Sequence, residues 1–187
     1  MTALLRFNEV TCVRGGRTLF EGLDLALRPG EALLVTGPNG CGKSSLLRLA
    51  AGLLRPASGT IERGEVALAD DSLALDRELP LGRALGFWAR LDGAPPNKAL
   101  DAMGLTALAE VPVRFLSTGQ ARRARLARVI ASGVLLWLLD EPANGLDSDG
   151  LAQLTTAIAD HRSAGGAVLA ASHGALAGAW RTLDLTP

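Results

Sequence analysis

The segment that most constrains this chain of 187 residues is glycine-rich and reads Gly37-Pro38-Asn39-Gly40-Cys41-Gly42-Lys43-Ser44. It matches G-x-x-x-x-G-K-[ST], with a short apolar run (31–36) before it and a helical pattern (44–54) after it. Glycines let successive backbone N–H groups turn toward an anion, and the helix N-terminus adds partial positive charge. We expect Lys43 to reach the β- and γ-phosphates of a nucleotide, Ser44 to hold Mg²⁺, and Ser45 to extend the binding loop. The alternative, a glycine-rich turn with a chance lysine, does not explain the flanking strand and helix.

Two adjacent carboxylates follow an apolar strand at 134–139. Asp140 can bind Mg²⁺ through water, and Glu141 can polarise an attacking water. The alternative is a strand-ending turn with two solvated acids. Because the phosphate loop lies upstream, we expect an adjacent strand of the sheet to deliver Asp140 beside Ser44.

The order of elements predicts an α/β fold. Apolar or alternating runs predict strands at 4–13, 23–27, 31–36, 65–69, 134–139 and 166–171. Helical patterns cover 44–54, 79–90, 97–108, 121–132 and 150–163, with a break at Gly93 to Pro96. Strands that alternate with helices imply a mainly parallel sheet covered on both faces, with ligands at the strand C-terminal ends. We expect one domain, 1–187, in which a small helical lobe at about 73–117 interrupts a core made of about 1–72 and 118–187.

The charge balance gives no support to nucleic acid as a partner, because the formal net charge is +0. One basic cluster, Arg122, Arg123, Arg125 and Arg128, falls at helical spacing, and we interpret it as a solvated helix face. No apolar run approaches the roughly 20 residues of a membrane span, and no targeting segment is evident. The two cysteines show no metal-ligand spacing, which fits a reducing compartment. We expect a cytoplasmic location unless a partner holds the chain at a membrane.

Three further segments carry a resemblance to a known family. Leu116-Ser117-Thr118-Gly119-Gln120 resembles the signature sequence of the ABC ATPases and lies between the two motifs above, in the family's order. The alternative is a simple Ser-Thr-Gly helix cap. Ala143 to Asp147 resembles the family's D-loop, and His173 matches its switch histidine, whereas we interpret His161 as polar surface.

The resemblance implies a P-loop NTPase of ABC type, with an antiparallel N-terminal β subdomain beside the parallel core. It implies a head-to-tail homodimer, in which ATP lies between the loop of one copy and the signature residues of the other, namely Ser117, Gly119 and Gln120. Lys43, Glu141 and His173 would then carry hydrolysis. The resemblance also implies integral membrane permease subunits as partners and a peripheral position on the cytoplasmic face of the inner membrane, without a span of the chain's own.

Two positions depart from the family pattern. Arg14 stands near the place of an aromatic residue that stacks on adenine; a guanidinium can stack on a base too. The segment after 65–69 lacks the family's glutamine, so Asp71 or Ser72 would take its place.

Weaker markers at 14–23, 81–91 and 110–114 resemble the ATP-binding subunits of haem exporters in cytochrome c maturation. The alternatives are a soluble, non-transport ABC ATPase and a module that binds ATP without turning it over. Phe87 and Trp88 either pack in the core or shape a surface for a helix of the membrane partner. Cys41 is either a reactive thiol that faces the nucleotide or a small filler in a tight loop.

Overall fold

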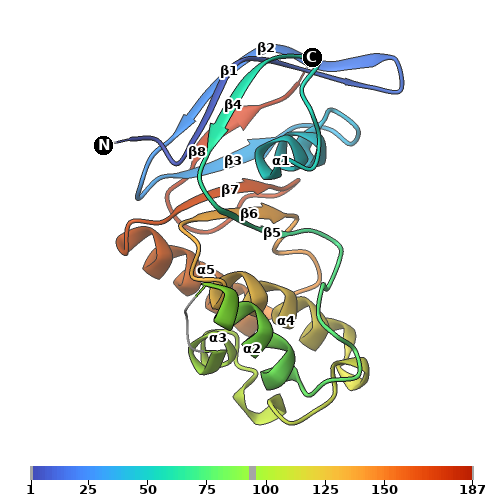
Figure 1. The fold of residues 1–187 in the computed structure, drawn as a ribbon, viewed down its shortest axis with the longest axis vertical. Helices are drawn as coiled ribbons and strands as arrows, with labels where there is room; N and C mark the ends of the chain where they lie inside the picture. The colour runs from blue at the N-terminus through green and yellow to red at the C-terminus, as the bar shows by residue number, and fades with distance from the viewer. Residues whose placement is uncertain (1, 93–95, 187) are drawn as a thin grey trace.

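The computed structural model describes residues 2–92 and 96–186, which form two sheets and a group of helices (Figure 1). The first sheet is antiparallel, with the strand order β2-β1-β4. It consists of β1 (Leu5–Arg14), β2 (Arg17–Leu27) and β4 (Ser58–Arg63). One face of β1 is apolar and buries Leu5, Phe7 and Val10, which fixes the register against its two neighbours.

The second sheet is parallel in every pairing and has the strand order β5-β6-β7-β3-β8. Its strands are β3 (Ala32–Thr36), β5 (Val66–Ala69), β6 (Leu136–Asp140), β7 (Ala167–Ala171) and β8 (Arg181–Asp184). The central strands are almost continuously apolar because both of their faces are covered. β7 separates β3 from β6, so the expectation that the strand carrying Asp140 lies next to β3 is wrong.

The helices cover the parallel sheet on both faces. Helix α1 (Lys43–Ala51) contacts strands of both sheets and lies between them. On the other face lie α2 (Leu81–Asp92), α3 (Pro96–Ala102), α4 (Thr118–Ala131) and α5 (Ser148–Ser163), as Figure 1 shows. Short 3₁₀ turns occupy Thr106–Leu108 and Val113–Phe115. Two apolar cores result, one around α1 and the first sheet and one beneath α2 to α5.

The expected fold class is confirmed, and the elements differ from expectation mainly at their edges. The strands β4 and β8 were not predicted, because both are short, polar and largely exposed. β2 begins at Arg17 rather than at 23. The predicted helix at 97–108 is α3 followed by a 3₁₀ turn, and most of the expected break before it, residues 93–95, lies outside the described residues.

Two interpretations of polar residues are wrong. Arg125 and Arg128 are only 8% and 6% exposed, so the basic cluster on α4 is not a solvated face. His161 is not free polar surface, because its ring stacks on Trp137 with centroids 3.7 Å apart. Burial lowers the pKa of His161, and hydrogen bonding with the backbone of Leu135 and Ala167 opposes that shift. Within 2–92 and 96–186, no helix has the length and apolar character that crossing a bilayer requires.

Candidate active site

The phosphate-binding loop joins β3 to α1 and takes its shape from glycines in left-handed backbone conformations. Gly37 has φ 134°, Gly40 has φ 79°, and Gly42, the N-cap of α1, has φ 119°. A Cβ on Gly42 would lie 3.2 Å from Cβ of Leu19 on β2, so the loop is also closely covered from that side. The loop conformation therefore depends on glycine at these positions.

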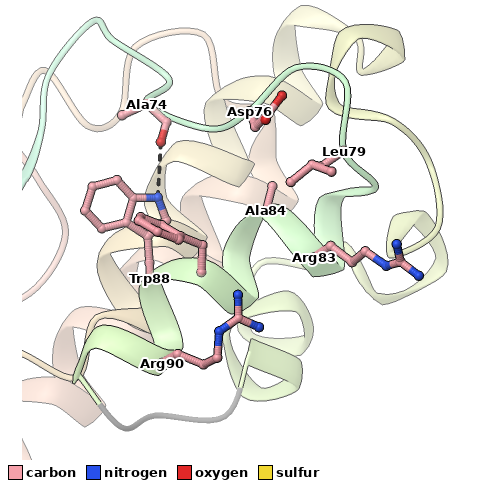
Figure 2. A pocket seen from close by; sticks show the side chains of 8 residues that line it. Ala74, Asp76, Leu79, Arg83, Ala84, Trp88 and Arg90 are labelled. Carbon is pink, nitrogen blue, oxygen red and sulfur yellow. Dashed lines mark hydrogen bonds between the residues drawn. The ribbon is translucent and has the colours of Figure 1, made fainter.

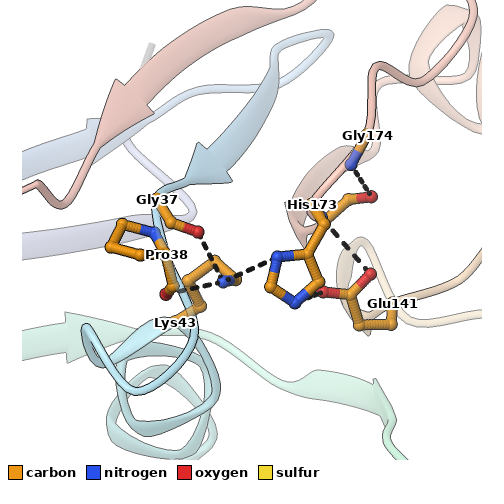
Figure 3. Close-up of polar contacts among 7 residues, drawn as sticks. Gly37, Pro38, Lys43, Glu141, His173 and Gly174 are labelled. Carbon is orange, nitrogen blue, oxygen red and sulfur yellow. Dashed lines mark hydrogen bonds and ion pairs between the residues drawn. The ribbon is translucent and has the colours of Figure 1, made fainter.

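Lys43 is 93% buried beneath this loop, and its ammonium is bound by backbone carbonyls (Figure 3). Its Nζ donates to the carbonyls of Gly37, at 2.8 Å, and Pro38, at 3.2 Å, and lies 3.5 Å from Nδ1 of His173. No carboxylate is paired with Lys43 in the described part of the chain. The positive charge is therefore positioned but not neutralised, as binding of an anionic phosphate requires.

Glu141 and His173 form the other side of this cluster. Nε2 of His173 lies 3.2 Å from Oε1 of Glu141, and the backbone N–H of His173 donates to Oε2 at 3.4 Å. Glu141 follows β6 and has φ 46°, a left-handed conformation that is costly for a residue with a Cβ. Its N–H donates to the carbonyl of Ala171 at the end of β7, which holds the strained turn. Lys43, His173 and Glu141 thus meet at the C-terminal ends of three parallel strands.

Asp140 lies beside Ser44, as the sequence predicts, although their strands are not adjacent. The Ser44 hydroxyl lies near the Asp140 carboxylate, and hydrogen bonding from it lowers the pKa of Asp140. Helix α1 contacts β6 directly, and this packing carries Ser44 across β7 to Asp140. Burial raises the pKa of Asp140, the Ser44 bond opposes that shift, and the neighbouring charge of Glu141 adds to it. A hydroxyl and a carboxylate in contact at a phosphate loop are suitable oxygen donors for Mg²⁺.

A cavity of about 230 Å³ opens between these groups. It is lined by Leu19, Asn39, Gly40, Gly42, Lys43, Ser44, Ser45, Glu141 and His173. Sequence reasoning named all of these except Leu19. Position 19 belongs to a strand that the sequence placed only from 23 onward, and this late start concealed it.

The signature residues lie at the start of α4 and do not line this cavity. The Ser117 hydroxyl accepts from the Gln120 N–H at 3.3 Å, and the Gln120 side chain accepts from the Ser117 N–H at 2.9 Å. This reciprocal capping box shows that the segment forms the helix cap that the alternative predicts. A Cβ built on Gly119 would meet nothing within 4 Å, so the surface over this helix end is open.

Comparison with known proteins agrees with this geometry. The family model described as "ABC transporter" matches residues 20–144. This chain belongs to the ABC transporter family. It is 61% identical to the "Cytochrome c biogenesis ATP-binding export protein CcmA" of Sphingopyxis alaskensis, covering 95% of this chain and 93% of that protein. The protein of the same name from Zymomonas mobilis is 53% identical and covers 98% and 85%.

Among solved structures, an ATP-binding protein of ABC transporter type from Pyrococcus furiosus superposes with a TM-score of 0.84. It covers 97% of this chain and 96% of that one, and at 22% identity it supports the fold alone. With the family shown, the chain is an ATPase of the ABC transporter type.

Arg14 and Cys41, which were expected near the nucleotide, do not line this cavity. Arg14 is exposed, pairs opposite Arg17 at the end of the β1–β2 hairpin and does not line the cavity. Cys41 is only 5% exposed, and a Cβ on Gly37 would come within 2.9 Å of its sulfur. This packing favours the second of the two alternatives, in which the Cys41 side chain is a small filler under the loop.

The burial of Asp140 predicts that removing its charge stabilises the fold but weakens metal binding. Because its pKa is raised, ionised Asp140 destabilises the nucleotide-free protein at pH 7. We expect Asp140→Asn to raise the free energy of unfolding at pH 7. The gain should shrink as the pH falls through the raised pKa, where wild-type Asp140 is also neutral. The same variant should weaken Mg²⁺-dependent ATP binding about tenfold or more.

Urea unfolding at several pH values and Mg²⁺ titrations of ATP binding measure the two effects. Asp101→Asn, an exposed site on α3, is the matched control and should change neither quantity. Lower stability of Asp140→Asn at pH 7 would contradict the assigned burial cost.

Proposed function

We propose that this chain is the ATP-hydrolysing subunit of a haem exporter that acts in cytochrome c maturation. The contact of Lys43, His173 and Glu141 over one phosphate loop supports hydrolysis rather than mere ATP binding. The transport assignment rests on the two relatives named cytochrome c biogenesis ATP-binding export proteins, which match nearly the full chain.

In the proposed mechanism, positioning and electrostatics supply most of the catalysis. The loop N–H groups and Lys43 bind the phosphates. Lys43 can also stabilise the negative charge that develops on the β–γ bridging oxygen. Glu141 orients the attacking water and accepts its proton while the bond between the bridging oxygen and the γ-phosphorus breaks. His173 contacts Glu141 through Nε2 and faces Lys43 through Nδ1, so it holds both groups in position at the γ-phosphate. Ser44 and Asp140 would hold Mg²⁺, which supplies charge neutralisation of the β- and γ-phosphates.

We propose that the working form is a head-to-tail homodimer. The signature residues Ser117 and Gly119 do not line the chain's own cavity, yet the Gly119 backbone is open to an approaching group. A second copy could therefore present this helix N-terminus, with its partial positive charge, to the γ-phosphate.

The membrane partner is proposed to bind the helical lobe, about residues 73–117. A cavity of about 530 Å³ lies between α2 and the segment before it. Figure 2 shows side chains that line it. Its mouth carries exposed apolar side chains, with Phe87 51% and Leu79 36% exposed, and Arg83 and Arg90 at its rim. An apolar cleft with a basic rim suits an amphipathic segment of a permease. In this proposal the chain works at the cytoplasmic face of the inner membrane, and nucleic acid is not a partner.

The catalytic part of the proposal predicts the effect of Glu141→Gln. Loss of the base should lower the ATPase rate about 100-fold or more, while ATP affinity stays near wild type, because the loop and Lys43 are unchanged. Steady-state phosphate release and fluorescent-nucleotide binding measure the two quantities. Turnover close to that of wild type would exclude the assigned role of Glu141.

The partner site predicts the effect of a charge at its mouth. We expect Phe87→Asp to reduce recovery of the chain with integral membrane proteins in detergent extracts, with the ATP affinity unchanged. Leu53→Asp is the matched control, since Leu53 is 68% exposed and does not line the cleft. Equal recovery of the Phe87→Asp and Leu53→Asp variants with membrane proteins would contradict the partner site. Recovery of the wild-type chain with ribosomes instead of membrane proteins would contradict the transport assignment.

A further inference from the structure

The buried arginines of α4 are not explained by the ATPase site. Arg125 and Arg128 each keep a buried Nε without a hydrogen-bond partner in the described structure. Burial lowers the pKa of both groups, which reflects the cost of removing two like charges from water. Apolar residues could fill this space at lower cost, so the two guanidinium groups call for a specific explanation.

Both arginines bind the free edge of the parallel sheet. Nη1 of Arg125 donates to the carbonyl of Asp70 at 2.6 Å, and Nη2 of Arg128 donates to the carbonyl of Leu68. β5 is the edge strand, and carbonyls two residues apart point to the same side. The arginines are three residues apart on α4, so their spacing along the helix matches the spacing of the two acceptors. The signature helix is thereby fastened to the edge strand at two points.

The first of these points lies at the metal-binding edge of the ATPase site. Nη1 of Arg125 is 3.9 Å from Oδ1 of Asp71, an exposed carboxylate. The register of β5 against β6, Ala69 opposite Leu139, places Asp70 and Asp71 beside Asp140. A change of charge around Asp140 therefore acts on the same loop that Arg125 binds.

The second point lies at the proposed partner cleft. The guanidinium carbon of Arg128 sits 4.9 Å from the ring centroid of Trp88. The indole N–H of Trp88 donates to the carbonyl of Ala74 at 3.1 Å, a bond drawn in Figure 2. Trp88 and Ala74 both line the cleft. Contacts therefore run without a break from Asp71 through Arg125, α4 and Arg128 to Trp88.

We propose that Arg125 is a positioning residue that transmits the nucleotide state of the Asp140 edge to the cleft around Trp88. Mg²⁺ held near Asp140 would change the field at Asp71 and would compete with Arg125 for the Asp71 carboxylate. The Arg125 contact to the loop shifts as a result, and α4 carries that shift to Arg128 and Trp88. The inference rests on the proposed coupling between this ATP site and a membrane partner, but it can be tested on the isolated chain.

Trp88 is itself the reporter for the test. The parent protein carries Glu141→Gln, so that bound ATP persists. The Trp88 signal is the tryptophan emission of this protein minus that of the same protein with Trp88→Phe. We expect Mg-ATP to change the Trp88 emission in the parent. In Arg125→Gln the Mg-ATP-induced change in Trp88 emission should be at least about fivefold smaller than in the parent. Fivefold is the lower end of typical coupling between sites. Affinity for a fluorescent ATP analogue, measured on separate samples, should stay within about threefold, less than 1 kcal/mol.

Arg123→Gln is the matched control, since it removes the same charge from the same helix. Arg123 makes no hydrogen bond or ion pair among the side-chain contacts of the described residues, and we expect a parent-like response. Arg125→Lys keeps the charge but not the planar fork and should fold with an intermediate response if Arg125→Gln is unstable.

Three results would overturn the link. The first is a parent that gives no Trp88 response to Mg-ATP. The second is an Arg125→Gln variant with the same response as the parent. The third is loss of both ATP binding and the Trp88 response in both Arg125 variants. The last would make Arg125 a support of the fold. Failure of the parent to bind the ATP analogue would instead contradict the proposed function.

Discussion

The ammonium group of Lys43 is the charge around which the site is built. It is buried, it is bound by carbonyls of the loop that it serves, and it lies beside Nδ1 of His173. No carboxylate is paired with it among the described residues, so its charge remains for phosphate. Glycines at left-handed positions permit that loop, and the packing of α1 between the two sheets fixes its orientation. His173 and Glu141 reach the same point because β6 and β7 end at the same edge of the parallel sheet. Each catalytic contact thus follows from strand order and loop backbone together.

In the proposed dimer, one chain supplies only part of each nucleotide site. Ser117 and Gln120 satisfy each other in a capping box, which leaves the α4 N-terminus ordered and the Gly119 backbone accessible. The same helix is fastened to the edge of the sheet by Arg125 and Arg128. Helix α4 therefore has an exposed N-terminus and a body that is fastened beside Asp140. This position lets it connect the nucleotide site to the cleft around Trp88.

The sequence predicted those features that depend on local chemistry. The glycine pattern and the apolar strand before Asp140 sufficed to place the loop, Lys43, Ser44 and the carboxylates. Asp140 lies beside Ser44 although β6 and β3 are not neighbours in the sheet. Helix α1, which carries Ser44, packs directly on β6, so adjacent strands are not required. Features set by tertiary packing could not be predicted. Spacing alone cannot show that Arg125 and Arg128 are buried against β5 or that Leu19 covers the loop, and β4 and β8 lack the apolar alternation that marks a strand.

The central claim, that two copies share each ATP site, is tested most directly by mixing two inactive variants. Lys43→Ala disables the loop of one copy, and Gly119→Asp places a carboxylate on the signature surface of the other. In a head-to-tail heterodimer, one site combines both defects and the other combines the intact loop with the intact signature helix. The account predicts that each variant alone has almost no ATPase activity and that the mixture regains it. A mixture no more active than the sum of its two components would contradict the shared site.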